Sequence, residues 1–241
     1  MKPLSKPSKD PVKVFRELKE IFDQIAGEYS GKRRKPWREA DLLLEAKLVL
    51  DSGCGSGRHL VYLSKSGVEV VGIDLAPNML KEALKYAEWR GDLKRVHVVA
   101  CDMLHLPFRD GIFDGVLMLA SLHHIPTSKL RLECLKEHFR VMKREGTIVV
   151  SVWTILQLRF LMKLPKLLLD KLLGRVWEFG DLYVPWRSLK GRTFRRFYHL
   201  FRRAELKELL EEAGFKVKRI YGTKFKDPIF SENHVAVAVK P

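Results

Sequence analysis

A glycine-rich turn and three spaced acids are the residues of this chain that could hold a nucleotide-like ligand. Asp51-Ser52-Gly53-Cys54-Gly55-Ser56-Gly57 follows a short apolar run, and Asp74 and Asp102 each end a later one. Glycines let the backbone approach a ligand closely, and an acid about 20 residues beyond such a turn can accept hydrogen bonds from ribose hydroxyls. Asp102 could meet an adenine amine. Each acid alone could equally be a helix cap or a turn residue, but their places at three successive strand ends favour a ligand site.

A second group, residues 187–203, combines positive charge with aromatic rings and contains no acid. Its members are Arg187, Lys190, Arg192, Arg195, Arg196, Arg202 and Arg203, with Phe194, Phe197, Tyr198 and Phe201. Cations bind phosphates and aromatic faces stack on unpaired bases, which is what recognition of a single-stranded RNA loop requires. In a structural interpretation, at least two of the four rings belong to the core.

The net charge points to the same kind of partner. The chain has 241 residues with 45 Lys and Arg against 29 Asp and Glu, so its formal net charge is +16. Residues 143–226 carry 20 basic and 8 acidic side chains, which is 20 − 8 = +12 of that excess. Such a region attracts polyanions such as nucleic acid. The alternative is a solvated, thermally adapted surface, because the chain has only two Asn and two Gln, a bias typical of thermophile proteins.

Cysteine content and hydropathy exclude several classes of protein. Cys54, Cys101 and Cys134 are odd in number and far apart, so neither a disulfide framework nor a zinc site is expected, and no metal is predicted. No apolar run approaches the roughly 18 to 20 residues that cross a bilayer, and residues 1–11 lack the apolar centre of a signal peptide. A globular, cytoplasmic protein is therefore expected.

The elements that position these residues alternate along the chain. Apolar runs rich in Val, Leu and Ile predict buried strands at 48–51, 68–74, 96–102, 113–120 and 146–153. Helical patterns lie at 59–66, 77–90, 128–142 and 204–213, and two last strands are predicted at 215–221 and 234–240. This order predicts an α/β fold with a doubly wound, mostly parallel seven-stranded sheet that ends in a β-hairpin.

Two segments fall outside this framework, and we expect them to belong to one domain of residues 1–241. Residues 1–47 predict a helical cover with helices around 12–26 and 38–46. Residues 154–203 form a basic insertion on the substrate side, and its leucine-rich part carries Arg or Lys at roughly one-turn spacing. A basic amphipathic helix, or a pair interrupted at Pro165, is expected there as a lid; membrane-surface association is the weaker alternative.

The motifs Asp51-x-Gly-x-Gly-x-Gly, Asp74 and Cys101-Asp102-Met103 resemble those of class I S-adenosylmethionine-dependent methyltransferases. The resemblance covers about residues 45–153 and the last two strands. It implies that the cofactor is S-adenosylmethionine and that its contacts are Asp51, Gly53, Gly55, Gly57, Asp74, Leu75, Asp102, Met103 and Ala120. The sequence at 120–126, ASLHHIP, lacks the Asn/Asp-Pro-Pro-Tyr/Phe motif of amino-group methylation, and no cysteine is placed to attack a pyrimidine ring.

Further segments resemble the eukaryotic tRNA wobble-uridine methyltransferases and the methyltransferase part of an animal AlkB-type dioxygenase. They lie at 22–26, 35–37, 123–124, 180–186, 196–201 and 213–215. Those enzymes esterify 5-carboxymethyluridine, so the resemblance implies a tRNA anticodon loop as substrate. It also implies a small zinc-binding activator subunit in a heterodimer, and Tyr29, Arg33 and Trp37 as a cover over the cofactor. The stretch 156–173 departs from this family.

Esterification of a carboxylate needs orientation rather than a base. A carboxylate with a pKa of about 4 is ionised at neutral pH and can attack a methyl group directly. We expect Arg196, with His123 or His124, to orient it, and His124 to face the reacting group. Contacts to RNA are expected from Arg192, Arg195, Tyr198, His199 and Arg202.

Other interpretations stay open. The two histidines could merely cap the turn into the next helix. The leucine-rich insertion would suit a methyltransferase of lipids or quinone-like small molecules. A non-catalytic RNA-binding subunit is a third possibility, against which the glycine turn and the three acids speak.

Overall fold

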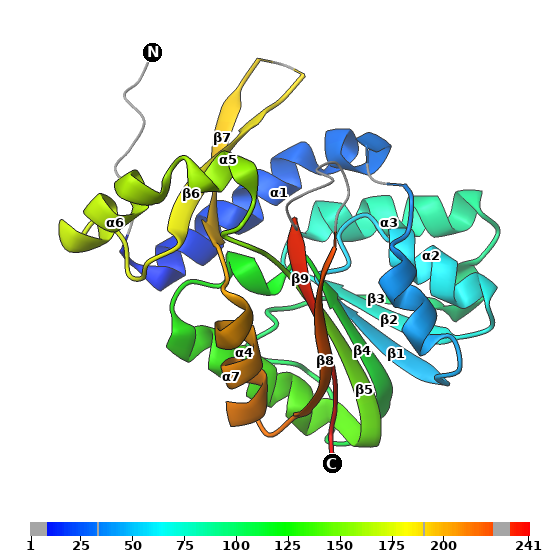
Figure 1. Cartoon of the computed structure of the whole chain (residues 1–241). Helices are drawn as coiled ribbons and strands as arrows, with labels where there is room; N and C mark the ends of the chain where they lie inside the picture. The colour runs from blue at the N-terminus through cyan, green and yellow to red at the C-terminus, as the bar shows by residue number, and fades with distance from the viewer. Residues whose placement is uncertain (1–8, 33, 190, 224–231) are drawn as a thin grey trace.

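A seven-stranded sheet forms the centre of the fold (Figure 1). The structure, a computed structural model, describes residues 9–32, 34–189, 191–223 and 232–241. The strands of the sheet are β1 (Leu48–Ser52), β2 (Glu69–Asp74), β3 (Val96–Ala100), β4 (Phe113–Leu119), β5 (Met142–Trp153), β8 (Lys216–Thr223) and β9 (Asn233–Val239). Their order is β3-β2-β1-β4-β5-β9-β8, and β9 is antiparallel to both neighbours whereas the other pairs are parallel. The predicted doubly wound α/β fold with its final hairpin is confirmed.

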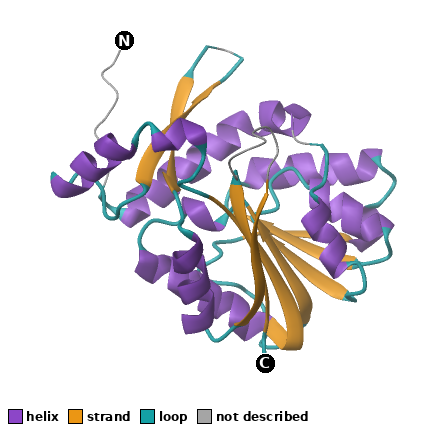
Figure 2. Cartoon of the chain, in the orientation of Figure 1, coloured by secondary structure: helices purple, strands orange, loops and turns teal. Residues whose placement is uncertain are grey.

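Both faces of the sheet are buried, which is why its strands are almost continuously apolar. α4 (Ser128–Val141) and α7 (Arg203–Glu212) cover one face, and α2 (Arg58–Lys65) and α3 (Pro77–Trp89) cover the other (Figure 2). Successive residues of β4 alternate between the two cores, since Val116 joins one and Leu117 the other. The four helices that cover the sheet agree with the predicted ranges to within one residue at each end. A short 3₁₀ turn, η2 (Leu93–Arg95), leads into β3.

The N-terminal cover is a long helix followed by a short one. α1 (Pro11–Lys32) extends beyond the predicted 12–26, and Tyr29 in this extension continues the apolar face that Ile25 and Ala26 turn toward Met79 of α3. The helix predicted at 38–46 is instead a 3₁₀ helix, η1 (Arg38–Leu43). Its buried Ala40 and Leu43 are three residues apart, which is the repeat of a 3₁₀ helix.

The insertion after β5 begins with two short helices, as the sequence predicts, and continues as a β-hairpin, which the sequence pattern does not predict. The helices are α5 (Leu158–Leu161) and α6 (Leu164–Leu172), with Pro165 in the first turn of α6. β6 (Asp181–Arg187) and β7 (Thr193–His199) pair as a separate antiparallel sheet (Figure 2). Pro185 within β6 hides this strand in the sequence, and an edge strand tolerates its missing N–H.

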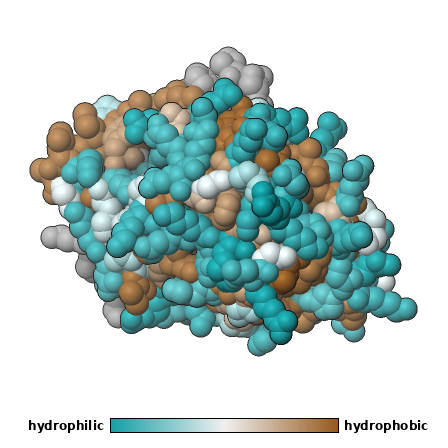
Figure 3. Space-filling model, turned by 90° about the horizontal axis from the view of Figure 1, so that it is seen from below, coloured by the Kyte–Doolittle hydropathy of each residue, from teal (hydrophilic) through white to brown (hydrophobic). Residues whose placement is uncertain are grey.

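Part of α6 presents leucines to the surface. Leu167 faces inward and is only 4% exposed, whereas four neighbours are at least half exposed, namely Leu168, Leu169, Leu172 and Leu173. Figure 3 shows hydrophobic surface at the left edge of the view, the side on which Figure 1 places α6. No helix in the described ranges is long and apolar enough to cross a membrane.

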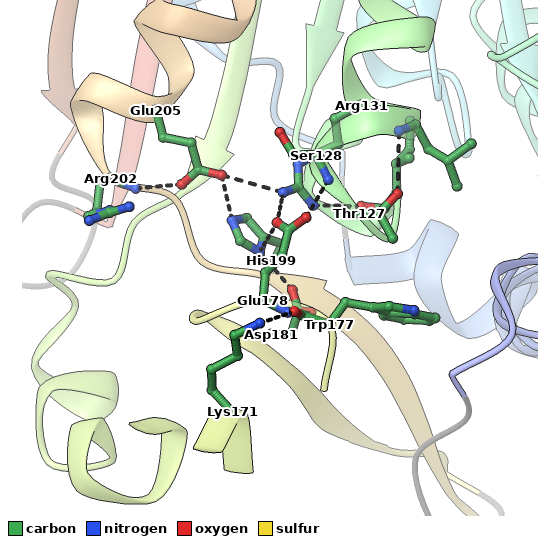
Figure 4. Close-up of polar contacts among 12 residues, drawn as sticks. Thr127, Ser128, Arg131, Lys171, Trp177, Glu178, Asp181, His199, Arg202 and Glu205 are labelled. Carbon is green, nitrogen blue, oxygen red and sulfur yellow. Dashed lines mark hydrogen bonds and ion pairs between the residues drawn. The ribbon is translucent and has the colours of Figure 1, made fainter. Parts of the chain in front are cut away.

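A buried network of charges joins the hairpin to the core (Figure 4). His199, at the end of β7, has one ring nitrogen 2.7 Å from Asp181 of β6 and the other 2.7 Å from Glu205 of α7. The fully buried Arg131 of α4 forms ion pairs with Glu205, at 3.4 Å, and with Glu178. The network therefore connects both strands of the hairpin to the two helices behind the sheet.

The position of His199 suits its protonated form. Burial alone would lower the pKa of His199, but hydrogen bonds with Asp181 and Glu205 outweigh it and raise the pKa above its ordinary value. The prediction that His199 contacts RNA is wrong, because the structure buries this residue and engages both of its nitrogens. Glu178, Asp181 and His199 are close enough to share a metal ion, but Arg131 and His199 already supply positive charge there.

Replacing His199 by glutamine should destabilise the protein most at low pH. A raised folded-state pKa means that the stabilisation is complete below the unfolded pKa of about 6.5 and is lost as pH rises through the folded value. We expect His199→Gln to reduce the free energy of unfolding by about 3 kcal/mol at pH 6 and by less at pH 9, measured by chemical denaturation.

An equal loss at both pH values would contradict a protonated His199. His97→Gln, at an exposed position of β3, is the matched control and should change the free energy of unfolding by under about 0.5 kcal/mol.

Candidate active site

A cleft opens where β1, β2 and β4 end, at the point where the order of the parallel strands reverses. Ligands of open α/β sheets bind at such a switch point. Seven of the predicted cofactor contacts line this cleft, namely Gly53, Gly55, Asp74, Leu75, Asp102, Met103 and Ala120. Of the predicted cover, Tyr29 of α1 lines this cleft, Trp37 does not, and Arg33 lies outside the described residues. We call this the cofactor cleft.

Two glycines of the turn have different physical roles. Gly53 has a φ of +74°, and a Cβ there would lie 2.4 Å from Oγ of Ser121, so only glycine fits beside the residues that follow β4. Gly57 has a φ of +78°, and its Cβ would meet Ala83 of α3 at 2.8 Å. Gly57 is not among the residues that line the cofactor cleft. Its place is explained by close contact between α2 and α3.

Two carboxyl groups, the buried Asp51 of β1 and the half-buried Asp74 of β2, lack a full complement of opposite charge. Asp51, although predicted as a cofactor contact, is 1% exposed and is not among the residues that line the cofactor cleft; its Oδ2 has no hydrogen-bond partner among the described residues. Burial raises the pKa of Asp51 to about 7, with a smaller opposing effect of Arg58. Burial likewise raises the pKa of Asp74 to about 6. A cationic ligand in the cofactor cleft would stabilise the ionised form of both carboxyl groups and lower both pKa values.

The strand-end acids also organise the loops around the cleft. One oxygen of Asp74 accepts the N–H of Gly55 at 3.0 Å, and the other accepts the N–H of Ala76, before α3, at 2.9 Å. Asp102 accepts the N–H of Leu104 at 2.9 Å. Asp74 and Asp102 are therefore turn residues rather than helix caps, since each accepts the N–H two residues further on, and both carboxylates lie at the edge of the cleft.

A second cleft joins the first at Ala120 and His124, which line both. Ala120 has a φ of +58°, a strained backbone conformation that it shares with Thr127 and Glu145, and of these three only Ala120 lines the clefts. The other walls of this acceptor cleft are rich in aromatic and basic side chains, including Trp37, Arg58, His123, Trp153, Arg159, Trp186, Arg187, Arg196 and Tyr198. Glu232 is the one acid among its described lining residues. The acceptor cleft therefore suits a flat ring that carries negative charge.

Arg196 of β7 places an uncompensated positive charge in the wall of the acceptor cleft. It is only 6% exposed, and its guanidinium carbon lies 5.0 to 5.7 Å from the ring centres of Phe22, Trp186 and Tyr198. Within the described part of the chain no acid pairs with Arg196, and its Nε has no hydrogen-bond partner. Burial of a charge costs several kcal/mol unless an opposite charge compensates, so this arginine is placed to bind an anion.

The two adjacent histidines of η3 (Leu122–His124) carry their protons on different nitrogens. The backbone N–H of Trp153 donates to Nδ1 of His123 at 3.2 Å, so Nε2 of the neutral ring carries the proton. Nδ1 of His124 lies 2.9 Å from the carbonyl oxygen of Phe197 and donates to it, which leaves its Nε2 as an acceptor. Burial lowers the pKa of His123, and that of His124 to about 3, so both are neutral at pH 7.

The remaining predicted RNA contacts are divided between surfaces. Tyr198 lines the acceptor cleft, whereas Arg195 lines a different cleft on the other face of the hairpin. Arg192 and Arg202 are exposed and line neither. Two arginines of the acceptor cleft were missed by the sequence analysis: Arg58, which is 5.1 Å from the Trp37 ring, and Arg159, which is 4.6 Å from the Trp153 ring. Arg58 directly follows the glycine turn, which is a signal that could have found it.

The fold and the cofactor cleft define a class I S-adenosylmethionine-dependent methyltransferase. The uncompensated Asp51 fits the positively charged cofactor, as does the close backbone approach at Gly53. A family profile described as a methyltransferase domain matches residues 50–150. A protein of Encephalitozoon cuniculi named as a methyltransferase is 31% identical over 202 residues, which are 82% of this chain and 86% of that protein. The chain therefore belongs to this methyltransferase family.

Two other relatives are informative. The tRNA (carboxymethyluridine(34)-5-O)-methyltransferase of Schizosaccharomyces pombe is 28% identical over 221 residues, 81% of this chain and 86% of that protein. A crystal structure of a SAM-dependent methyltransferase from Methanosarcina mazei is 25% identical with a TM-score of 0.67, covering 80% of this chain and 92% of the other. Both agree with the class that the fold defines.

Binding of S-adenosylmethionine should weaken on acidification. Asp51, with a pKa raised to about 7, must give up its proton when a cation binds nearby. The dissociation constant should therefore rise about tenfold from pH 8 to pH 6, with release of a proton on binding. Calorimetry in buffers of different ionisation enthalpy measures both quantities.

Asp51→Asn is the control: its amide cannot titrate, so this variant should bind more weakly and lose most of the pH dependence, keeping only the smaller part that Asp74 contributes near pH 6. A dissociation constant that stays the same from pH 6 to pH 8 in the unmodified protein would refute the role given to Asp51.

Proposed function

We propose that this methyltransferase esterifies a carboxylate on tRNA, the carboxymethyl group of a modified wobble uridine. The observation that carries the proposal is Arg196, a buried cation without an acidic partner among the described residues, in an aromatic cleft that opens into the cofactor cleft. The name of the Schizosaccharomyces pombe relative describes this reaction for that protein.

The site residues supply orientation. When bound, S-adenosylmethionine supplies a methyl group on a positively charged sulfur, so a carboxylate oxygen can take the methyl while the bonding electron pair stays on sulfur. Arg196 can donate two hydrogen bonds in a plane to the carboxylate. His123 can add a third through Nε2. No proton has to be removed, because the acceptor is already an anion.

His124 has a different role from the one expected for the pair. Its Nε2 can only accept, so it cannot hold a carboxylate, although it does line both clefts. We assign to it the recognition of an N–H or O–H of the substrate next to the reacting group. The interpretation of the two histidines as mere turn caps assigns no role to the Nε2 atom of either ring.

The proposed reaction also identifies the partners of this enzyme. The tRNA anticodon loop is the macromolecular substrate, and a cytoplasmic location gives access to it. A small zinc-binding activator subunit is part of the proposal on the family resemblance alone.

Methylation of an apolar small molecule is the second candidate, favoured by the exposed leucines of α6. Transfer of a radiolabelled methyl group to bulk tRNA or to a lipid extract distinguishes the two. Mass spectrometry of the tRNA nucleosides then identifies the modified base.

Arg196→Gln should reduce kcat/KM for tRNA that contains carboxymethyluridine by at least about 100-fold, because a buried charge pair is lost. The kcat/KM of Arg196→Lys should lie between those of the unmodified enzyme and of Arg196→Gln, since lysine keeps the charge but lacks the planar pair of donors. The free energy of unfolding should not decrease, because no acid loses its partner. Arg219→Gln, at an exposed position of β8, is the control and should act like the unmodified enzyme. Normal turnover by Arg196→Gln would overturn the proposal.

The turnover number at saturating cofactor should be constant from about pH 6 to pH 9. The substrate carboxylate is ionised throughout this range, and the lowered pKa values of His123 and His124 keep both rings neutral. Steady-state kinetics across this range test it. A steep rise of kcat through pH 7 to 8 would reveal a base that this scheme lacks.

A further inference from the structure

A cleft on the opposite face of the hairpin from the acceptor cleft is not used by the proposed reaction. Adjacent residues of a strand project to opposite faces, so Arg196 lines the acceptor cleft whereas Arg195 lines this outer cleft. Its other walls come from Lys9, from α6 and from the loop after α6. The polar side chains that line it are Lys9, Lys163, Lys166, Asp170, Arg175, Asp181, Tyr183 and Arg195.

Positive charge exceeds negative charge in the outer cleft. Asp170 is shared between Lys166, at 2.7 Å, and Arg175, at 3.2 Å. The other acid, Asp181, is buried and bonded to His199. Three cations are thus left without an acidic partner among the described residues: Lys9, Lys163 and Arg195.

Two of these cations are held in place by aromatic rings. The guanidinium carbon of Arg195 lies 5.5 Å from the ring centre of Tyr183, and Nζ of Lys163 lies 5.8 Å from that of Phe160. Such contacts reduce the freedom of long side chains without neutralising them. The outer cleft is therefore a preformed site for a polyanion.

We propose that the outer cleft binds backbone phosphates of the substrate RNA, on the far side of the hairpin from the reacting nucleotide. Arg187 in the acceptor cleft and the exposed Arg192, which directly precedes β7, continue the basic surface around the hairpin. One RNA strand can then contact both faces. This inference deepens the proposed function and rests on it for the identity of the polyanion.

An anionic lipid surface offers the same phosphate chemistry, and α6 carries exposed leucines close to this cleft. RNA is favoured because the positive charge continues from the outer cleft to the acceptor cleft along one hairpin. The two sources make different predictions for the same variants.

Fluorescence anisotropy with a labelled anticodon stem-loop RNA tests the site without any methyl transfer. The double variant Lys163→Gln/Arg195→Gln should bind this RNA at least about tenfold more weakly at 0.1 M salt. The slope of log K against log salt should decrease in magnitude by about 1.4, since each phosphate contact to a single strand contributes about 0.7. The control Lys65→Gln/Lys94→Gln removes the same net charge on the α2 and α3 side and should leave the slope unchanged.

Equal losses in the two double variants would show only the effect of net charge and would overturn the inference. So would unchanged RNA binding by Lys163→Gln/Arg195→Gln combined with reduced binding to vesicles of anionic phospholipid. Because the assay measures binding alone, a failure of carboxylate methylation would leave its result valid.

Discussion

The active site depends on one electrostatic constraint, a buried guanidinium that no carboxylate of the described chain neutralises. Arg196 is surrounded by Phe22, Trp186 and Tyr198, whose rings compensate only part of the cost of removing a charge from water. Such a buried cation is expected where a ligand of opposite charge binds and compensates it. The neighbouring His123 presents a proton and His124 a lone pair, so the donors and acceptors of the cleft are fixed before any substrate arrives.

The rest of the fold keeps Arg196 in this position. Its strand belongs to a two-stranded sheet outside the main one, so the hairpin needs other contacts to stay on the core. The network of His199, Arg131 and three carboxylates provides them at one end, and α1 packs against β7 along its length. One strand thus carries both functions, with Arg196 in the wall of the acceptor cleft and His199 in the buried charge network.

The sequence predicted the parts of this protein that follow from local chemistry. The sheet, its helices and the positions of Asp74, Asp102 and Gly53 could be predicted because strand burial and close backbone approach restrict residue types strongly. The hairpin could not, because Pro185 and a run of arginines obscure the alternation that marks a strand. Without that alternation the sequence does not show that Arg195 and Arg196 lie on opposite faces, and it predicts His199 at the surface. The tautomers of the histidines depend on partners far away in sequence.

Esterification would remove the charge that Arg196 is placed to bind, so the acid should bind the acceptor cleft more tightly than its ester. The most direct test is calorimetric titration of 5-carboxymethyluridine and of its methyl ester into the protein saturated with S-adenosylhomocysteine. We expect the acid to bind at least about tenfold more tightly, a difference of about 1.4 kcal/mol, and Arg196→Gln to abolish the difference. Equal affinity for acid and ester would contradict a carboxylate as the group that this cleft recognises.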